Sequence, residues 1–194
     1  MCSMQRHLFD PAETVPHGFR YEDDFLAPEE ETALLSAVRT LPLEHARYKE
    51  YSARRRIASF GGRYDFSNNE LLEAAPLPAW LFPLRERAAT WAGLSASQID
   101  HALVAEYAPG TPLGWHRDVP EFEAIVGVSL GGSCRMRFRR YPPRKPGRAE
   151  VSVEVAPRSI YTMQHEARWG WQHSVSPTKE LRYSITFRTL RIGR

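Results

Sequence analysis

Two histidines and one aspartate in the second half of the chain have the residue types of a metal site. His116 and Asp118 lie two positions apart in the segment Gly-Trp-His-Arg-Asp, and His173 follows in the segment Trp-Gln-His-Ser-Val. Two imidazoles and one carboxylate on one side of a metal leave its other positions open, which is typical of non-haem Fe(II) oxygenases. The sequence therefore predicts a metal site made by His116, Asp118 and His173.

Two arginines, Arg182 and Arg188, follow the second histidine in the segment Arg-Tyr-Ser-Ile-Thr-Phe-Arg. A guanidinium group matches the two oxygens of a carboxylate, so both arginines could hold a dicarboxylate against the open metal positions. Each residue also has an ordinary interpretation: His116 as a hydrogen-bonded loop histidine, His173 as a partly buried histidine, and the arginines as the charged face of a strand. The order of the residues and their surrounding segments favour the metal site.

These surrounding segments resemble the AlkB family of Fe(II)- and 2-oxoglutarate-dependent dioxygenases. The resemblance extends from about residue 54 to residue 188, and its most specific part is the closing Arg-Tyr-x-x-Thr-Phe-Arg. The matching segments are 105–110, 116–118, 125–131, 157–159, 168–173 and 182–188.

The resemblance implies three cofactors or co-substrates: Fe(II), 2-oxoglutarate and O2. It assigns catalysis to the three metal ligands and expects Arg182 to pair with the far carboxylate of 2-oxoglutarate, assisted by Tyr107, with Arg188 nearer the metal. The residues expected to bind the co-substrate are Tyr107, Arg182, Ser184 and Arg188. The implied reaction oxidatively removes or hydroxylates alkyl groups on nucleic acid, as in alkylation repair or RNA demethylation.

Three positions depart from the family pattern. The family often has Asn where Ala105 and Ser184 stand, and those amides help to hold 2-oxoglutarate. Alanine offers no side-chain hydrogen bond, and serine offers a shorter hydroxyl. Where DNA-repair members carry a second acid two residues after the metal aspartate, this chain has Pro120. These departures keep a protein side chain or a small molecule open as the substrate.

Two other classes of protein remain as alternatives. The chain could be a non-catalytic nucleic-acid-binding module that keeps a metal only to stabilise its fold, although the intact set of ligands and arginines argues against this. A zinc hydrolase could use the same three ligands. Arg182 and Arg188 would then have no assigned role.

Composition indicates one globular domain. The chain has 194 residues, 42% of them hydrophobic, and no apolar run of membrane-spanning length. Its first residues lack the apolar stretch of a signal peptide, and two cysteines form no disulfide framework. We expect a cytoplasmic monomer without membrane association or an obligate protein partner.

Positive charge is concentrated in residues 135–148, which contain seven basic side chains and no acidic ones. The rest of the chain is slightly acidic, with 19 basic against 23 acidic residues. Because Arg135, Arg137 and Arg139 alternate with Met136 and Phe138, a strand here would place three arginines on one face. The pattern predicts contacts with phosphate groups of DNA or RNA, with Arg137 and Arg139 as substrate candidates. The alternative is a solvated, arginine-rich loop.

Helical patterns come first along the chain, and strand patterns follow. A proline and three acids predict a helix that starts at residue 28, and a second helix is expected from near Pro83 to Gly93. After residue 100, short branched or alternating segments predict strands at 103–107, 125–130, 134–138, 151–155, 159–163 and 183–190.

This order predicts an α+β fold, and many short strands around a metal suggest a jelly roll. The resemblance implies a double-stranded β-helix with N-terminal helices packed on the sheet. We expect one dioxygenase domain over residues 1–194. Its helical N-terminal part and substrate lid would lie in 1–100, and its jelly-roll catalytic core in 101–194.

Residues 52–64 combine arginines, aromatic residues and a Gly pair. In the resembled family this region forms part of a substrate lid, and flat rings can stack on a splayed base. Arg56 and Tyr64 are therefore further substrate candidates, whereas Phe60 is expected in the core. Trp115, Trp169 and Trp171 are expected to form a hydrophobic wall around the metal.

Overall fold

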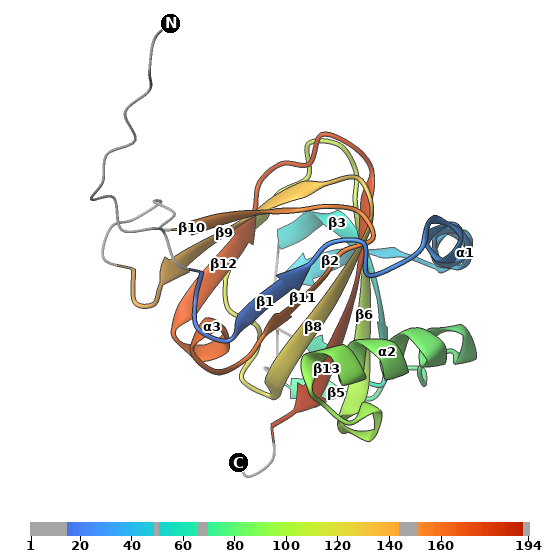
Figure 1. The fold of residues 1–194 in the computed structure, drawn as a ribbon, viewed down its shortest axis with the longest axis horizontal. Coiled ribbons are helices and arrows are strands. Elements are labelled where there is room, and N and C mark those ends of the chain that lie inside the picture. The colour runs from blue at the N-terminus through green and yellow to red at the C-terminus, as the bar shows by residue number, and fades with distance from the viewer. Residues whose placement is uncertain (1–14, 49–50, 66–69, 144–150, 192–194) are drawn as a thin grey trace, which may run out of the picture.

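The computed structural model, which describes residues 15–48, 51–65, 70–143 and 151–191, consists of two facing antiparallel sheets with helices on the outer side of the larger one (Figure 1). Within these residues the larger sheet has seven strands, in the spatial order β1 (Phe19–Glu22), β11 (Ile160–Met163), β8 (Phe122–Gly131), β13 (Arg182–Leu190), β6 (Ile99–Tyr107), β3 (Tyr51–Phe60) and β2 (Glu44–Tyr48). The smaller sheet has the order β10 (Val151–Val155), β9 (Cys134–Arg140), β12 (Trp171–Val175) and β7 (Leu113–His116). This is the expected α+β jelly roll.

The remaining elements are short or lie outside the two sheets. Strands β4 (Arg63–Asp65) and β5 (Glu70–Leu72) pair with each other. The helices are α1 (Pro28–Arg39), α2 (Phe82–Ala92) and α3 (His165–Trp169), with short 3-10 turns η1 (Ala79–Leu81) and η2 (Ala96–Gln98). In the described part of the chain, none of the helices has the length and apolar composition of a membrane span.

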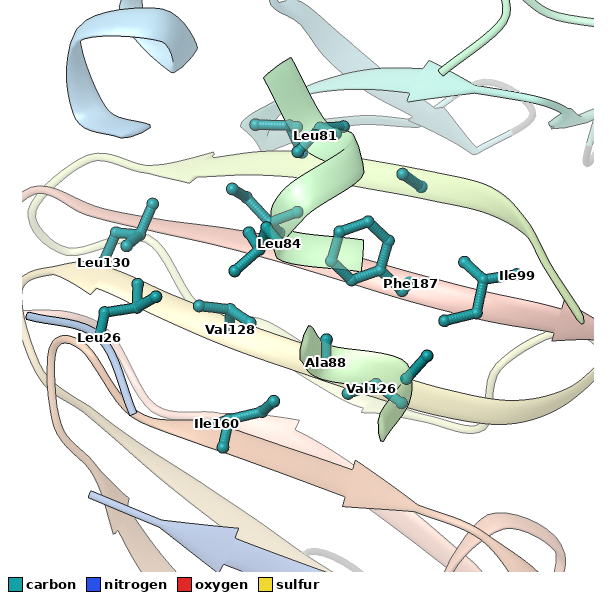
Figure 2. Close-up of a cluster of buried hydrophobic side chains, with 14 of the residues drawn as sticks. Leu26, Leu81, Leu84, Ala88, Ile99, Val126, Val128, Leu130, Ile160 and Phe187 are labelled. Atoms are coloured by element: carbon teal, nitrogen blue, oxygen red, sulfur yellow. The ribbon is translucent and has the colours of Figure 1, made fainter. Parts of the chain in front are cut away.

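The two predicted helices form for the reasons that the sequence gives. Helix α1 starts at Pro28, with three glutamates in its first turn. Helix α2 ends before Gly93, whose φ of 73° is the left-handed conformation that a glycine adopts without strain. Both helices pack on the larger sheet, where Val38 and Ala88 join strand residues in one apolar cluster (Figure 2).

The central strands β6, β8 and β13 of the larger sheet are buried on both faces, and strand alternation gives the two faces different chemistry. On β13, the side chains of Tyr183, Ile185 and Phe187 enter the cluster under the helices, in which Phe187 is labelled in Figure 2. The alternate residues of β13 face the smaller sheet; they are Arg182, Ser184, Thr186 and Arg188. A second apolar cluster, which includes Met136 and Phe138, fills the space between the two sheets beside these polar groups.

All six predicted strands are confirmed, although the observed strands are often longer. The N-terminal part is less helical than we expected, because β1 to β5 also lie there. Strands β7 and β12 were not predicted. Their residues, Leu-Gly-Trp-His and Trp-Gln-His-Ser-Val, lack a simple apolar alternation, since each face of the smaller sheet carries both polar and apolar side chains: Trp115 and Ser174 on one face, His173 and Val175 on the other.

One close approach in the larger sheet depends on a glycine. Gly127 on β8 pairs with Tyr161 on β11, and a Cβ atom at Gly127 would lie 2.2 Å from Cζ of the Tyr161 ring. Tyr161 is buried and lines the cavity between the sheets. The missing side chain at Gly127 therefore allows the tyrosine ring to lie flat across the strand.

We predict that Gly127→Ala lowers the free energy of unfolding by about 1–3 kcal/mol, because the added methyl group overpacks a buried ring. Chemical denaturation of the metal-free protein measures this. Gly114→Ala is the matched control, since a Cβ atom there meets nothing within 4 Å. Equal stability of the two variants would contradict the steric explanation.

Candidate active site

The three predicted metal ligands lie together at one end of the smaller sheet. His116 ends β7 and pairs directly with His173 on β12, with 4.2 Å between the ring centroids. Asp118 follows two residues later, and its Oδ2 lies 3.7 Å from Nε2 of His173. One ligand atom from each residue lies within 4.8 Å of the others, so the group could hold a metal ion.

The protonation states of these residues suit a divalent cation. Burial lowers the pKa of both histidines, that of His173 to about 3, so both imidazoles are neutral at pH 7. Burial raises the pKa of Asp118, but the Arg188 guanidinium and, to a lesser extent, the two imidazoles lower it. The lowering effects are larger in total, so the pKa of Asp118 lies below its usual range. His116 Nδ1 lies 2.9 Å from the Gly114 carbonyl oxygen. Donation of its proton there leaves Nε2 free as the metal-binding atom.

Arg188 fixes the position of the aspartate. Its Nε and Nη2 donate to Asp118 Oδ1 at 3.3 and 3.1 Å, and its Nη1 lies 3.3 Å from Nδ1 of His101. Burial and the nearby Arg188 lower the pKa of His101 to about 3. The neutral ring can therefore accept a hydrogen bond from Arg188. His101 was not among the residues that the sequence indicated.

Arg182 is a buried charge whose described neighbours carry no negative charge. Its side chain is fully enclosed, with the residue 1% exposed, and Nε donates to Ser129 Oγ at 3.0 Å. Its guanidinium carbon lies 5.0 Å from the Tyr107 ring centroid. Burial raises the pKa of Cys134 and Tyr161, which keeps these neighbours neutral. Since an unmatched buried charge is costly, the arrangement suits an anionic ligand.

A single cavity of about 640 Å³ joins the metal ligands to both arginines. Its floor is the inner face of the larger sheet, where Ala105 on β6 pairs with Ser184 on β13. Two of the three positions that depart from the family pattern are therefore cross-strand neighbours. Tyr161, which the sequence also gave no reason to single out, lies close enough to Arg182 and Tyr107 to interact with them electrostatically.

The two lid candidates lie on different strands, Arg56 on β3 and Tyr64 on β4, and only Tyr64 lines the cavity. Arg56 points away from the cavity and makes a two-pronged ion pair with Glu106, at 2.7 and 2.8 Å. Arg55 lines the cavity instead, as does Tyr64. Among the described residues, the buried Nε of Arg55 has no hydrogen-bond partner. The alternation of Arg55 with Ile57 and Ser59, which also line the cavity, is the sequence signal that identifies this face.

The remaining candidates lie outside the cavity lining. Arg137 and Arg139 on β9 stand beside Trp115 on the outer face of the smaller sheet. The expectation that Trp115 contributes to a wall around the metal was wrong, because residues next to a ligand on a strand point to the opposite face. Trp171 belongs to the core between the sheets. The predicted basic segment continues into residues 144–148, which lie outside the described residues.

We predict that stability falls on acidification partly through His101. Its pKa is near 3 in the folded chain and about 6.5 when unfolded, so the unfolded state gains a proton first as the pH falls below 6.5. The slope between pH 6 and 5 approaches 1.4 kcal/mol per pH unit, roughly, for each such histidine. His101→Gln should flatten the slope by about one proton, measured by denaturation of metal-free protein at several pH values. The exposed His17→Gln is the control, and equal slopes in both variants would refute the assignment.

Comparison with known proteins connects this site to a family. A sequence profile described as the 2OG-Fe(II) oxygenase superfamily matches residues 18–192. Protein L905 of Acanthamoeba polyphaga mimivirus is 28% identical over 90% of this chain and 85% of its own length. The alkylated DNA repair protein ALKBH8 homolog of Arabidopsis thaliana is 28% identical, over 87% of this chain and 53% of its own length.

The Escherichia coli alpha-ketoglutarate-dependent dioxygenase AlkB is 32% identical, over 58% of this chain and 55% of its own length. The chain thus spans about half the length of these last two relatives. Among solved structures, OsALKBH1 superposes with a TM-score of 0.69 at 15% identity, covering 89% of this chain and 98% of that one, which confirms the fold. These relatives support the resemblance to AlkB proteins, and since the matched profile covers most of the sequence, the chain belongs to the 2OG-Fe(II) oxygenase superfamily.

Proposed function

We propose that this oxygenase, which uses Fe(II), 2-oxoglutarate and O2, oxidises alkyl groups on nucleic acid, as in alkylation repair or RNA demethylation. The observation that carries the chemistry is one cavity that contains both the metal-binding group and a buried guanidinium without a described counter-charge. The nucleic-acid substrate is inferred from AlkB-type relatives, one of which is named as an alkylated DNA repair protein.

We assign the co-substrate to the inner face of β13. Arg182 would pair with the far carboxylate of 2-oxoglutarate, because its guanidinium is buried, lines the cavity and can match two carboxylate oxygens. Tyr107 and Tyr161 would add hydroxyl donors there, with Ser184 nearby. Since Ala105 offers no amide, we propose that the Tyr161 hydroxyl supplies part of the hydrogen bonding that Asn provides in other members.

His116, Asp118 and His173 would hold the iron, and Arg188 would keep Asp118 ionised and correctly turned. The bound metal and co-substrate supply the oxidation, in which 2-oxoglutarate becomes succinate and carbon dioxide while a substrate C–H bond is hydroxylated. The protein contributes placement and exclusion of water. When the hydroxylated carbon is attached to nitrogen, it leaves as an aldehyde and the amine is restored.

The substrate would enter between β3, which lies in the expected lid region, and the smaller sheet. Arg55 on β3, Tyr64 on β4 and Arg117, which follows β7, all line the cavity. Arg56 remains a substrate candidate only if its ion pair with Glu106 opens. Pro120 replaces the acid that DNA-repair members use near the base. This favours the same chemistry on a protein side chain or a small molecule as the second candidate.

Other features of the proposal rest on sequence. We propose one dioxygenase domain over residues 1–194, with the lid in 1–100 and the catalytic core in 101–194. The cytoplasmic location and the monomeric state are predictions from composition alone.

We predict that methylated single-stranded DNA or RNA stimulates succinate formation by the Fe(II)-loaded protein, and that a methylated peptide does not. Asp118→Asn should abolish this formation and weaken metal binding, because it removes the anionic ligand. The control is Asp100→Asn, which changes an exposed aspartate at the start of β6. Stimulation by the peptide alone would move the assignment to protein side chains.

We predict that Arg182→Met removes stabilisation by 2-oxoglutarate without destabilising the ligand-free protein, since an unmatched buried charge is replaced by an apolar side chain of similar length. Thermal unfolding of the Mn(II)-loaded protein should show about 2.7 kcal/mol of stabilisation for the wild type at 2-oxoglutarate concentrations of about 100 times the Kd. The variant should show almost none. Arg135→Met, at an exposed arginine, should respond like the wild type. An unchanged response in Arg182→Met would refute the co-substrate assignment.

A further inference from the structure

The outer face of the smaller sheet carries two arginines arranged around one tryptophan. Arg137 and Arg139 on β9 reach across the neighbouring strand β12, where they donate to Ser174 Oγ at 3.1 Å and to Gln172 Oε1 at 2.8 Å. Their guanidinium carbons lie 5.1 and 4.4 Å from the Trp115 ring centroid on β7. We call Trp115, Arg137 and Arg139 the arginine–tryptophan face.

The charges of this face are not neutralised within the described residues. The hydrogen-bond partners of Arg137 and Arg139 there are neutral, and no described carboxylate lies within ion-pair distance of either. Arg135, on the same face of the same strand, differs because it pairs with Glu154 at 2.6 Å. Two positive charges are thus held in fixed positions by neutral groups and an aromatic ring.

The arginine–tryptophan face continues to the entrance of the cavity. Trp115 directly precedes His116, the last residue of β7, and Arg117 follows just beyond the end of that strand. Arg117 lines the cavity, and its guanidinium carbon lies 3.8 Å from the ring centroid of the exposed Tyr141. Its Nη1 donates to the Trp169 carbonyl at 3.0 Å. A second arginine–aromatic pair therefore links the metal cavity to the outer face.

We propose that the arginine–tryptophan face binds the sugar–phosphate backbone of a single strand whose target nucleotide occupies the cavity. The inference rests on the proposed nucleic-acid substrate and names the surface that would bind the rest of the strand. Guanidinium groups match phosphate oxygens in pairs, and arginines that already lie against a ring lose less freedom when they bind. A single strand fits because the target nucleotide must be splayed from its neighbours to reach the metal.

The test compares two protein variants, each of which replaces arginine by glutamine on β9. Arg137→Gln combined with Arg139→Gln keeps hydrogen-bonding side chains beside Ser174 and Gln172 but removes both charges. Arg135→Gln is the matched control, since its charge is already neutralised by Glu154. Fluorescence anisotropy measures the Kd of each protein for labelled single-stranded DNA and RNA from low to moderate salt.

The double variant should bind roughly tenfold more weakly at low salt, and its log–log salt slope should fall by about 0.7 for each lost phosphate contact. Its KM for a methylated oligonucleotide should rise in parallel. Arg135→Gln should change each value much less. Thermal unfolding of every variant checks that the fold is retained.

The outcomes separate this proposal from the proposed function. If the wild type binds and oxidises the oligonucleotides and the folded double variant matches it, or if Arg135→Gln loses as much affinity, the arginine–tryptophan face is not the binding surface. If the wild type neither binds nor oxidises any oligonucleotide, both the substrate class and this surface are overturned.

Discussion

The arrangement of the site depends on the burial of strand β13 on both faces. Alternation along this strand sends aromatic and aliphatic side chains toward the helices and sends Arg182 and Arg188 toward the smaller sheet. A guanidinium in such a place is tolerated only when other groups offset the loss of its hydration. Arg188 has Asp118 as a counter-charge, whereas the described neighbours of Arg182 are neutral. On the inner face of the sheet, Arg188 is thus paired with a carboxylate, whereas Arg182 has only neutral neighbours among the described residues.

Because of this asymmetry, ligand binding should have different effects at the two ends of the cavity. At the metal end, Asp118 is ionised and the imidazoles are neutral, so little proton release need accompany metal binding at neutral pH. At the far end, a bound carboxylate would supply the missing charge, and its binding free energy would add to the stability of the fold. His101 contacts Arg188 and interacts with the backbone of Gly62, which lies between β3 and β4, so it connects this part of the chain to Arg188 and through it to Asp118.

Residues that need one particular chemical type could be predicted from the sequence. Residues whose orientation depends on how the strands pair could not. Few residue types can bind a divalent metal or pair with a carboxylate, so the types and order of the candidate ligands His116, Asp118 and His173 and of Arg182 single them out. Arg55 and Arg56 are adjacent arginines, and only the pairing of Arg56 with Glu106 on β6 decides which of them faces the cavity. The position of the Tyr161 ring likewise depends on Gly127, its partner on the neighbouring strand β8. The two residues are far apart in the sequence, so only the pairing of the strands reveals their contact. The sequence predicted the strands with alternating or branched residues, whereas β7 and β12 were missed because polar and apolar residues are mixed along both strands.

Two surfaces of different chemistry meet at the metal. The cavity holds fixed charges that suit a small dianion, while the outer face of the smaller sheet holds Arg137 and Arg139 against Trp115. One short strand, β7, serves both, because consecutive residues point to opposite faces and His116 therefore follows Trp115. A chain bound along the outer face would reach the metal at the end of this strand, where Arg117 lies at the cavity. Alternation along β7 thus turns His116 toward the cavity and the adjacent Trp115 toward the outer face, beside Arg137 and Arg139.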